Sequence, residues 1–339
     1  MPTVVEIFCG AGIGAVGLKE LGYDILYAVD NNPYAVSTYN ANIGNHAVLG
    51  NVETLDYKTI PDSDIIIGGV PCLPFSFAGK GEGVNDKKHG NLIYEFYNII
   101  KYKKPKYVIF ENVKGIVSKN HQNVFYDFIA SLYELGYITS WKLTNCLEYG
   151  IPQKRERVIL VASLGDTYQF PDATHSKDEY VTIRTTIGDL PEPAINVNIK
   201  NHYGYGVRPD EAAFIDEVPI GGNWTDISID SQKKFMGNSY YSGGGKTGYL
   251  RKIAFDSYAY TITSTMNGKF NSQLVDLSDK YQDGSVKGCR RFTVRECLRL
   301  QTVPDWYSFA DVVPWSKQYE RCSGIPPLLI KKIAGALLF

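Results

Sequence analysis

The sequence has few of the residues that build metal sites, disulfide frameworks or membrane spans. Its six cysteines include no pair at CxxC spacing, and no histidine cluster accompanies them, so we expect neither a zinc site nor disulfide bonds. No apolar run approaches the roughly 20 residues of a membrane span, and the first residues do not resemble a signal peptide. We therefore expect a metal-free protein of the reducing cytoplasm, with no membrane segment.

The chain also lacks a net positive charge, because its 35 Lys and Arg are balanced by 36 Asp and Glu and the formal net charge is −1. A protein that coats nucleic acid without specificity would be strongly basic, so that class is excluded. Charge can still be segregated, and the stretch 233–252 has no acidic residue. A charge run is often only a solvated surface, but in a chain of near-zero charge this one favours contact with phosphates. The stretch carries Lys233, Lys234, Lys246, Arg251 and Lys252, together with Tyr240, Tyr241 and Tyr249.

The first half of the chain alternates short apolar runs with longer amphipathic stretches. This alternation predicts an α/β fold with a doubly wound, mostly parallel sheet that helices cover on both faces. We expect strands at residues 4–8, 25–29, 65–68, 107–111 and 158–162. We expect helices at residues 13–21, 33–42, 92–101 and 124–135.

The character of the sequence changes near residue 170. From there to about residue 287, Gly, Pro, Asn, Asp and Ser interrupt short β-like pieces such as 258–263, which predicts a smaller, irregular, β-rich domain. Helical spacing returns at 294–300, and a last helix is expected at 327–338. We expect a large domain formed by residues 1–170 and 318–339, and a small domain formed by residues 171–317.

A glycine-rich turn, residues 8–14, follows the first strand and opens the first helix. Glycines let the backbone approach a ligand, and a helix N-terminus favours negative charge. Asp30 ends the second strand, where a carboxylate can accept hydrogen bonds from ribose hydroxyls. A tight turn with an exposed Asp is the alternative. The spacing of Gly10, Gly12 and Gly14 is not GxGxxG, which argues against a dinucleotide-binding enzyme.

Cys72 follows Pro71 directly after the strand expected at 65–68. A cysteine there would project into the same cleft as the glycine turn, and its thiolate would be the reactive form. A lone Cys is usually a small buried hydrophobe, but prolines on both sides stiffen this backbone more than a core position needs. Residues 78–90 are glycine-rich and cationic, which suits a mobile lid, with a surface loop as the alternative.

Six segments, in this order along the chain, resemble the motifs of the DNA (cytosine-5) methyltransferases. The resemblance covers nearly the whole chain except the region from about 171 to 255, and six motifs in order make chance implausible. It implies a Rossmann-like, S-adenosylmethionine-dependent catalytic domain and a small target-recognition domain. The segments are residues 8–12 (Phe-Cys-Gly-Ala-Gly), 71–76 (Pro-Cys-Leu-Pro-Phe-Ser), 111–113 (Glu-Asn-Val), 153–158 (Gln-Lys-Arg-Glu-Arg-Val), 290–305 and 323–327 (Ser-Gly-Ile-Pro-Pro).

The resemblance implies a covalent mechanism on a cytosine that has been flipped out of the duplex. The Cys72 thiolate would add to C6 of the base, which makes C5 nucleophilic. Glu111 would contact N3 and the exocyclic amine, and must be protonated to donate to N3, a form that burial favours. Arg157 would contact O2, and Arg155 would lie near the thiol and a phosphate. Without the resemblance, Glu111 is equally a strand-end surface carboxylate, and the two arginines are better explained as a charged edge strand.

The resemblance also implies S-adenosylmethionine as methyl donor, with S-adenosylhomocysteine as product and no metal. Three positions depart from the family pattern in or near this site, namely Leu73, Asn51 and Ser323, and residues 302–303 are Thr-Val where Gly-Phe is usual. None of these departures removes a reacting group. The implied cofactor-binding residues are Phe8, Gly10, Gly12, Asp30, Asn31, Asn51, Pro71, Leu92 and Ser323.

Double-stranded DNA is the implied partner, and residues 225–275 are expected to hold the loops that read its sequence. We expect a monomer in a bacterial or phage-infected cell, with a cognate restriction endonuclease that acts separately. An RNA cytosine-5 methyltransferase and a catalytically inactive DNA-binding regulator are the alternatives; the basic stretch favours duplex DNA, and the presence of all reacting groups argues for an enzyme. The expected DNA-binding residues are Ser76, Lys80, Lys246, Arg251 and Thr261.

Overall fold

The structure, a computed structural model, describes residues 1–71, 92–193, 198–203, 206–242, 248–269, 272–278, 280 and 288–339. It divides into two compact units. Unit 1 comprises Met1–Tyr149, Arg155–Thr174 and Gly324–Phe339, and unit 2 comprises Gly150–Lys154 and His175–Ser323. The boundaries thus lie at 174/175 and 323/324, where the sequence indicated 170/171 and 317/318. The sequence did not indicate that residues 150–154 belong to unit 2.

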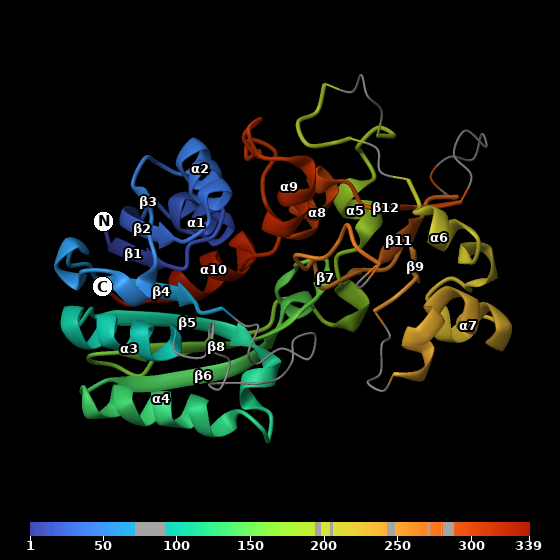
Figure 1. Ribbon diagram of the computed structural model, residues 1–339. Coiled ribbons are helices and arrows are strands. Elements are labelled where there is room, and N and C mark those ends of the chain that lie inside the picture. Colours follow the sequence, from blue (N-terminus) through green and yellow to red (C-terminus); the bar gives the residue numbers. More distant parts are fainter. Residues whose placement is uncertain are drawn as a thin grey trace. The chain divides into compact units, whose positions relative to one another are not determined.

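Unit 1 is built on a seven-stranded sheet of order β3-β2-β1-β4-β5-β8-β6 (Figure 1). All neighbouring strands are parallel except around β8, which runs antiparallel to both β5 and β6. The strand β6 at one edge and the short strand β3 at the other were not predicted from the sequence. The strands are β1 (Thr3–Ile7), β2 (Asp24–Asp30), β3 (Ala47–Leu49), β4 (Ile65–Gly69), β5 (Tyr107–Val113), β6 (Ile138–Asn145) and β8 (Glu156–Ser163).

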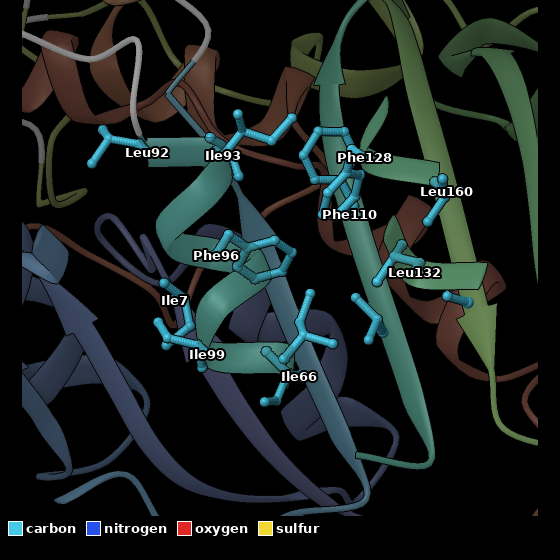
Figure 2. Packing of buried hydrophobic residues seen from close by; sticks show 14 of the residues in the cluster. Ile7, Ile66, Leu92, Ile93, Phe96, Ile99, Phe110, Phe128, Leu132 and Leu160 are labelled. Atoms are coloured by element: carbon cyan, nitrogen blue, oxygen red, sulfur yellow. The ribbon is translucent and has the colours of Figure 1, made fainter. Parts of the chain in front are cut away.

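Helices cover both faces of this sheet, as the apolar character of its central strands requires. On one face, α3 and α4 pack against side chains such as Ile7, Ile66, Phe110 and Leu160 (Figure 2). Alternation along β1 explains the two faces, because Val5 and Ile7 join this core while Glu6, the residue between them, points to the other side. The helices of unit 1 are α1 (Ile13–Glu20), α2 (Pro33–Asn42), α3 (Leu92–Lys103), α4 (Gln122–Glu134) and α10 (Pro327–Ala334).

The helices α1 and α10 pack closely together within unit 1. A Cβ atom on Gly17 would lie 2.4 Å from the carbonyl oxygen of Pro327, so this contact requires glycine. The Tyr23 hydroxyl donates to the carbonyl oxygen of Ala334, the last residue of α10. This helix ends four residues before the expected end at residue 338, because Gly335 caps it.

The strand ends that carry the expected site residues meet at one edge of the sheet, namely the edge where the parallel strands β1, β2, β4 and β5 end. In the register, Ile7 lies opposite Val29 and Gly68, and Gly69 lies opposite Glu111. The antiparallel strand β8 begins where β5 ends, so that Val113 lies opposite Arg157. The glycine turn, Asp30, the segment before Cys72, Glu111 and the Arg-Glu-Arg segment are therefore brought to the same edge by the topology of unit 1.

Unit 2 contains a three-stranded sheet, order β12-β11-β9, and the parallel pair β10-β7. Its small core includes Phe235, Met236, Leu250 and Leu274. Only Ala259–Tyr260 forms a strand within the β-like piece expected at 258–263. The strands are β7 (Gln153–Lys154), β9 (Arg251–Ala254), β10 (Ala259–Tyr260), β11 (Gln273–Asp276) and β12 (Cys289–Arg291), and the helices are α5 (Ile183–Ile187), α6 (Pro209–Ala212), α7 (Ile229–Met236), α8 (Val294–Leu300) and α9 (Trp315–Arg321).

No helix in the described part of the chain is long and apolar enough to cross a membrane.

Candidate active site

Glu111 is buried near the end of β5 and faces two arginines. Its Oε1 atom lies 2.8 Å from Nε of Arg157 and 3.7 Å from Nη2 of Arg155. The two guanidinium groups hold the carboxyl group of Glu111 in place between them. The Oε1 atom is buried but accepts no hydrogen bond from any residue that the structure describes, so the ion pair leaves its hydrogen-bonding capacity for another group.

Glu111 lies beside β4 and the short stretch of chain that follows it. A Cβ atom on Gly69, opposite it in β4, would lie 3.6 Å from Oε2. The neighbouring Asn112 is completely buried, and its Nδ2 atom donates to the carbonyl oxygen of Val70 at 3.4 Å. This bond ties the end of β5 to the chain just before Pro71, where the described part of this segment ends.

Several expected site residues lie outside the residues that the structure describes. They are Cys72, Ser76, Lys80 and Lys246, together with the expected lid at 78–90. Their roles remain predictions.

The glycine turn and Asp30 form a second group at the same edge of unit 1. The Gly10 backbone N–H donates to Oδ2 of Asp30 at 2.9 Å, and the Asn32 N–H donates to Oδ1 at 2.9 Å. The backbone at Phe8 has φ 60° and that at Gly10 has φ 55°, both in the left-handed region. No atom would lie within 4 Å of a Cβ on Gly10, whereas one on Gly12 would lie 2.8 Å from the Tyr39 ring. The turn therefore exposes backbone on one side and packs tightly on the other.

The remaining expected cofactor-binding residues differ in their exposure and in what their side chains contact. Asn31 is exposed directly after Asp30. The Asn51 side chain caps the short helix η1 (Val52–Thr54) by accepting from the Glu53 N–H at 3.2 Å. Leu92 begins α3 and is buried in the core of unit 1. Ser323 is exposed and is the last residue of unit 2.

One functional candidate, Glu6, was missed by the sequence reasoning. It lies in β1 between buried apolar residues, and the Tyr39 hydroxyl donates to its Oε2 atom at 3.1 Å. Burial, together with the charge of Asp30, raises the pKa of Glu6 to about 8. Burial likewise raises the pKa of the Cys9 thiol well above its usual range. The available signal was an acid in the middle of an apolar strand, which is uncommon without a partner or a function.

In unit 2, two expected DNA-binding residues lie beside each other. The Arg251 guanidinium stacks over the Tyr260 ring, 4.1 Å from its centroid. Thr261, the residue after Tyr260, donates from its hydroxyl to the carbonyl oxygen of Lys154 at 2.9 Å. Burial lowers the pKa of Arg251 and the neighbouring Tyr260 opposes this shift, and the guanidinium stays charged at any physiological pH.

No group of three or more His, Cys, Asp or Glu side chains that could hold a metal ion occurs among the described residues.

Comparison with known proteins gives consistent matches over the full length of the chain. The family model for C-5 cytosine-specific DNA methylases matches residues 2–338. The Type II methyltransferase M.PspPI of Psychrobacter sp. (strain TA137) is 32% identical over 91% of this chain and 72% of its own length. The Type II methyltransferase M.Eco47II of Escherichia coli is 30% identical over 98% of this chain and 78% of its own length.

Solved structures share the fold at lower identity. The S. pombe Dnmt2 methyltransferase superposes with a TM-score of 0.67 at 19% identity, covering 98% of this chain and 97% of its own. The Entamoeba histolytica methyltransferase EhMeth gives a TM-score of 0.71 at 16% identity, covering 99% of this chain and 97% of its own.

Proposed function

The chain belongs to the C-5 cytosine-specific DNA methylases, and from this premise we propose how its own residues carry out the reaction. It is a DNA cytosine-5 methyltransferase, its substrate is DNA, and its family generally uses S-adenosylmethionine. The proposal concerns the residues that activate the base, hold the methyl donor and contact the DNA.

The observation that carries the proposal is the buried carboxylate of Glu111 held between Arg157 and Arg155. A thiolate at Cys72 that bonds to C6 of cytosine pushes an electron pair into the ring. Protonated Glu111 neutralises that charge by donating to N3, and Arg157 holds O2. After C5 has been methylated, solvent water takes the C5 proton, the C–H electron pair restores the C5–C6 double bond, the S–C6 bond breaks to return the Cys72 thiolate, and N3 returns its proton to Glu111. Arg155 keeps the Glu111 carboxylate oriented throughout.

The glycine turn fits the methyl donor. Each Asp30 oxygen accepts one backbone N–H and retains a further lone pair, which suits two ribose hydroxyls. The space beside Gly10 admits a ligand against the backbone. When bound, S-adenosylmethionine supplies a methyl group on its sulfonium and leaves as S-adenosylhomocysteine. The residues that would hold it are Phe8, Gly10, Gly12, Asp30, Asn31, Asn51, Pro71, Leu92 and Ser323.

Duplex DNA is the proposed form of the substrate, with the target cytosine flipped out. Arg251 and Thr261, with Lys246, Ser76 and Lys80, would contact the DNA. The Type II names of the relatives support a role in restriction–modification, with a separate endonuclease as the functional partner. We propose that the enzyme acts as a monomer, because one chain supplies all the reacting groups.

Covalent trapping tests the proposed nucleophile. The modified site is first mapped by bisulfite sequencing of DNA from cells that express the enzyme. A duplex with 5-fluorocytosine at the target should then form an adduct with the wild-type enzyme, because fluorine at C5 prevents the release of Cys72.

Two variants make the trap specific. Cys72→Ser should abolish the adduct, whereas Cys289→Ser, at a half-buried thiol of unit 2, should retain it. An adduct with Cys72→Ser would refute the assignment of the nucleophile.

A further inference from the structure

Side-chain amides, more than strand pairing, hold the segment 259–262 of unit 2. The strand β10 is two residues long and, within the described ranges, pairs only with β7, which is equally short. The Ala259 N–H donates to the carbonyl oxygen of Pro152 at 3.0 Å. The residues after it, 260–262, form backbone hydrogen bonds with the side chains of buried glutamines. A segment that contains a proposed DNA contact thus depends on glutamine side chains for its conformation.

Gln273 supplies most of these bonds. It is 1% exposed at the start of β11, and its Oε1 atom accepts from the Tyr260 N–H at 2.9 Å. Its Nε2 atom lies 3.3 Å from the carbonyl oxygen of Tyr260 and 3.2 Å from that of Thr261. The carboxamide therefore stands in for a neighbouring strand, since it satisfies both the N–H and the C=O of one residue.

The partners determine how the Gln273 amide is oriented. A backbone N–H can only donate and a carbonyl can only accept, so rotating the amide by 180° would break all three bonds. No other residue type of this length provides an acceptor and a donor in this arrangement. The position therefore requires glutamine chemically, although it lies in none of the motifs that identify the family.

Gln273 also lies beside the groups that are proposed to touch DNA. In the parallel register of β11 and β9, it lies opposite Arg251, whose guanidinium stacks over the Tyr260 ring at 4.1 Å. The backbone that Gln273 holds is that of Tyr260 and Thr261. Fixing these two residues fixes both the aromatic face on which Arg251 rests and the hydroxyl of Thr261.

A second buried amide secures the other end of the segment. The Oε1 atom of Gln153 accepts from the Ile262 N–H at 2.9 Å, and its Nε2 atom donates to Oε1 of Gln301 at 3.1 Å. Gln301 in turn donates to the carbonyl oxygen of Cys322 at 2.9 Å. The segment is held from both sides, so its conformation is set in advance of any ligand.

We propose that Gln273 is a positioning residue for DNA binding, which holds Tyr260, Thr261 and the stacked Arg251 in their binding geometry without touching the DNA itself. This inference rests on the proposed DNA contacts of Arg251 and Thr261. It predicts that loss of the Gln273 amide weakens DNA binding while leaving the chemical step intact.

The test replaces the amide by a group of similar length that cannot form hydrogen bonds. Gln273→Met should raise the dissociation constant for a duplex carrying the mapped site about tenfold, the scale of one or two lost buried hydrogen bonds. The KM for DNA should rise in parallel, while kcat at saturating DNA should stay within about twofold of wild type. Fluorescence anisotropy and methyl transfer from labelled S-adenosylmethionine measure these quantities.

Gln318 offers a matched control in the same unit. It is also a buried glutamine, whose Nε2 atom donates to the carbonyl oxygen of Val313 at 3.0 Å and whose Oε1 atom accepts from Asn201 at 3.0 Å. Gln318→Met removes comparable bonds away from segment 259–262 and should leave DNA affinity within about twofold. If Gln273→Met does not fold, Gln273→Glu and Gln318→Glu repeat the comparison with side chains of the same planar shape that lack the amide donor.

The outcomes separate this inference from the proposed function. If Gln273→Met binds DNA as Gln318→Met does, while Arg251→Ala and Thr261→Ala bind weakly, the positioning role is refuted and the DNA contacts stand. If Arg251→Ala and Thr261→Ala bind as wild type, the proposed contacts fail, and the positioning role fails with them. The positioning role is supported if Gln273→Met, Arg251→Ala and Thr261→Ala all bind DNA weakly. In addition, the double variant Gln273→Met/Arg251→Ala should bind more tightly than the sum of the two single effects predicts.

Discussion

Each of the two units contains a buried Glu–Arg ion pair, and the two pairs differ in how much hydrogen-bonding capacity their groups leave unused. In unit 1, Arg157 lies 2.8 Å from Glu111, yet the buried carboxylate oxygen accepts no hydrogen bond from the described residues. In unit 2, Arg291 donates to both oxygens of Glu211, from Nε at 3.1 Å and from Nη2 at 2.5 Å. Glu211 and Arg291 are 0% and 2% exposed.

The Arg291 guanidinium is saturated in other directions as well. Its Nη1 atom donates to the carbonyl oxygens of Met266 at 2.7 Å and Gly268 at 3.0 Å. This pair therefore joins β12, α6 and the turn after segment 259–262, with no capacity left for a ligand. The comparison teaches that burial of a Glu–Arg pair does not by itself indicate catalysis; the two pairs differ in whether the glutamate keeps unused hydrogen-bonding capacity.

The largest effect is expected at the pair with unused capacity. Glu111→Gln keeps the shape but cannot give a proton to N3, so kcat should fall by about 10²- to 10⁴-fold. The free energy of unfolding should fall less than for a pair that also loses aligned hydrogen bonds, although Arg155 and Arg157 lose their counter-charge. Methyl-transfer kinetics and urea unfolding measure the two effects, and a variant with near wild-type kcat would remove the distinction between the pairs.

Glu211→Gln should show the reverse pattern. Loss of the Glu211 charge from this fully buried, hydrogen-bonded pair leaves Arg291 as an uncompensated buried charge. The free energy of unfolding should therefore fall by about 3–5 kcal/mol. The fraction that remains folded at low temperature should retain its kcat, because neither residue has free capacity to reach the base. A large loss of kcat in fully folded protein would show that this pair also takes part in function.

A third buried acid, Glu6, has no arginine partner among the residues that the structure describes, and it sharpens the comparison through pH. Its pKa is about 8 in the folded protein and 4.5 without the fold, so it is neutral when folded over most of that interval. Unfolding then releases a proton, and its contribution to stability is lost as the pH rises from about 4.5 to about 8, by at most roughly 1.4 kcal/mol per pH unit.

Glu6→Gln should remove this dependence. The variant should match wild type near pH 5 and exceed it in stability near pH 8, because its amide can still accept from the Tyr39 hydroxyl without ionising. Urea unfolding across this pH range is the measurement. Parallel curves for the two proteins would mean that Glu6 does not titrate in this interval.

The smallest effect is expected at an exposed pair beside the site. Lys114 lies 3.2 Å from Glu156, with side chains 51% and 42% exposed. Lys114→Ala should change the free energy of unfolding by less than about 1 kcal/mol, and less still at high salt. A larger effect would mean that proximity to the Arg155–Arg157 segment matters more than solvent exposure.

Elements with local signals were predictable from the sequence. The helix at Pro33–Asn42 has the expected bounds, because Asn32 caps it and Pro33 starts it. The helix at Val294–Leu300 likewise follows from Thr293 and Glu296, which form a capping box. The strand β6 was not predicted, because at the sheet edge its residues are mostly half-exposed and show no clear alternation.

The site was predictable only in part, and for a physical reason. The residues at the ends of parallel strands follow from the strand–helix alternation, which brings Asp30 and Glu111 to one edge. The ion pair between Glu111 and Arg157 depends on β8 running antiparallel, and only the family resemblance linked these two residues beforehand. The Glu211–Arg291 pair joins positions far apart in the sequence, in segments without a shared pattern, and was not predicted.

The assignment of residues 150–154 to unit 2 limits how this unit can be exchanged between related enzymes. These five residues carry β7, the strand partner of β10, and Gln153, which holds the Ile262 N–H. In a chimaera that imports only residues 175–323, the imported β10 would have to pair with the recipient's own β7. A transplant that keeps its folding partner must therefore take two separate stretches of the gene, one of them only five codons long.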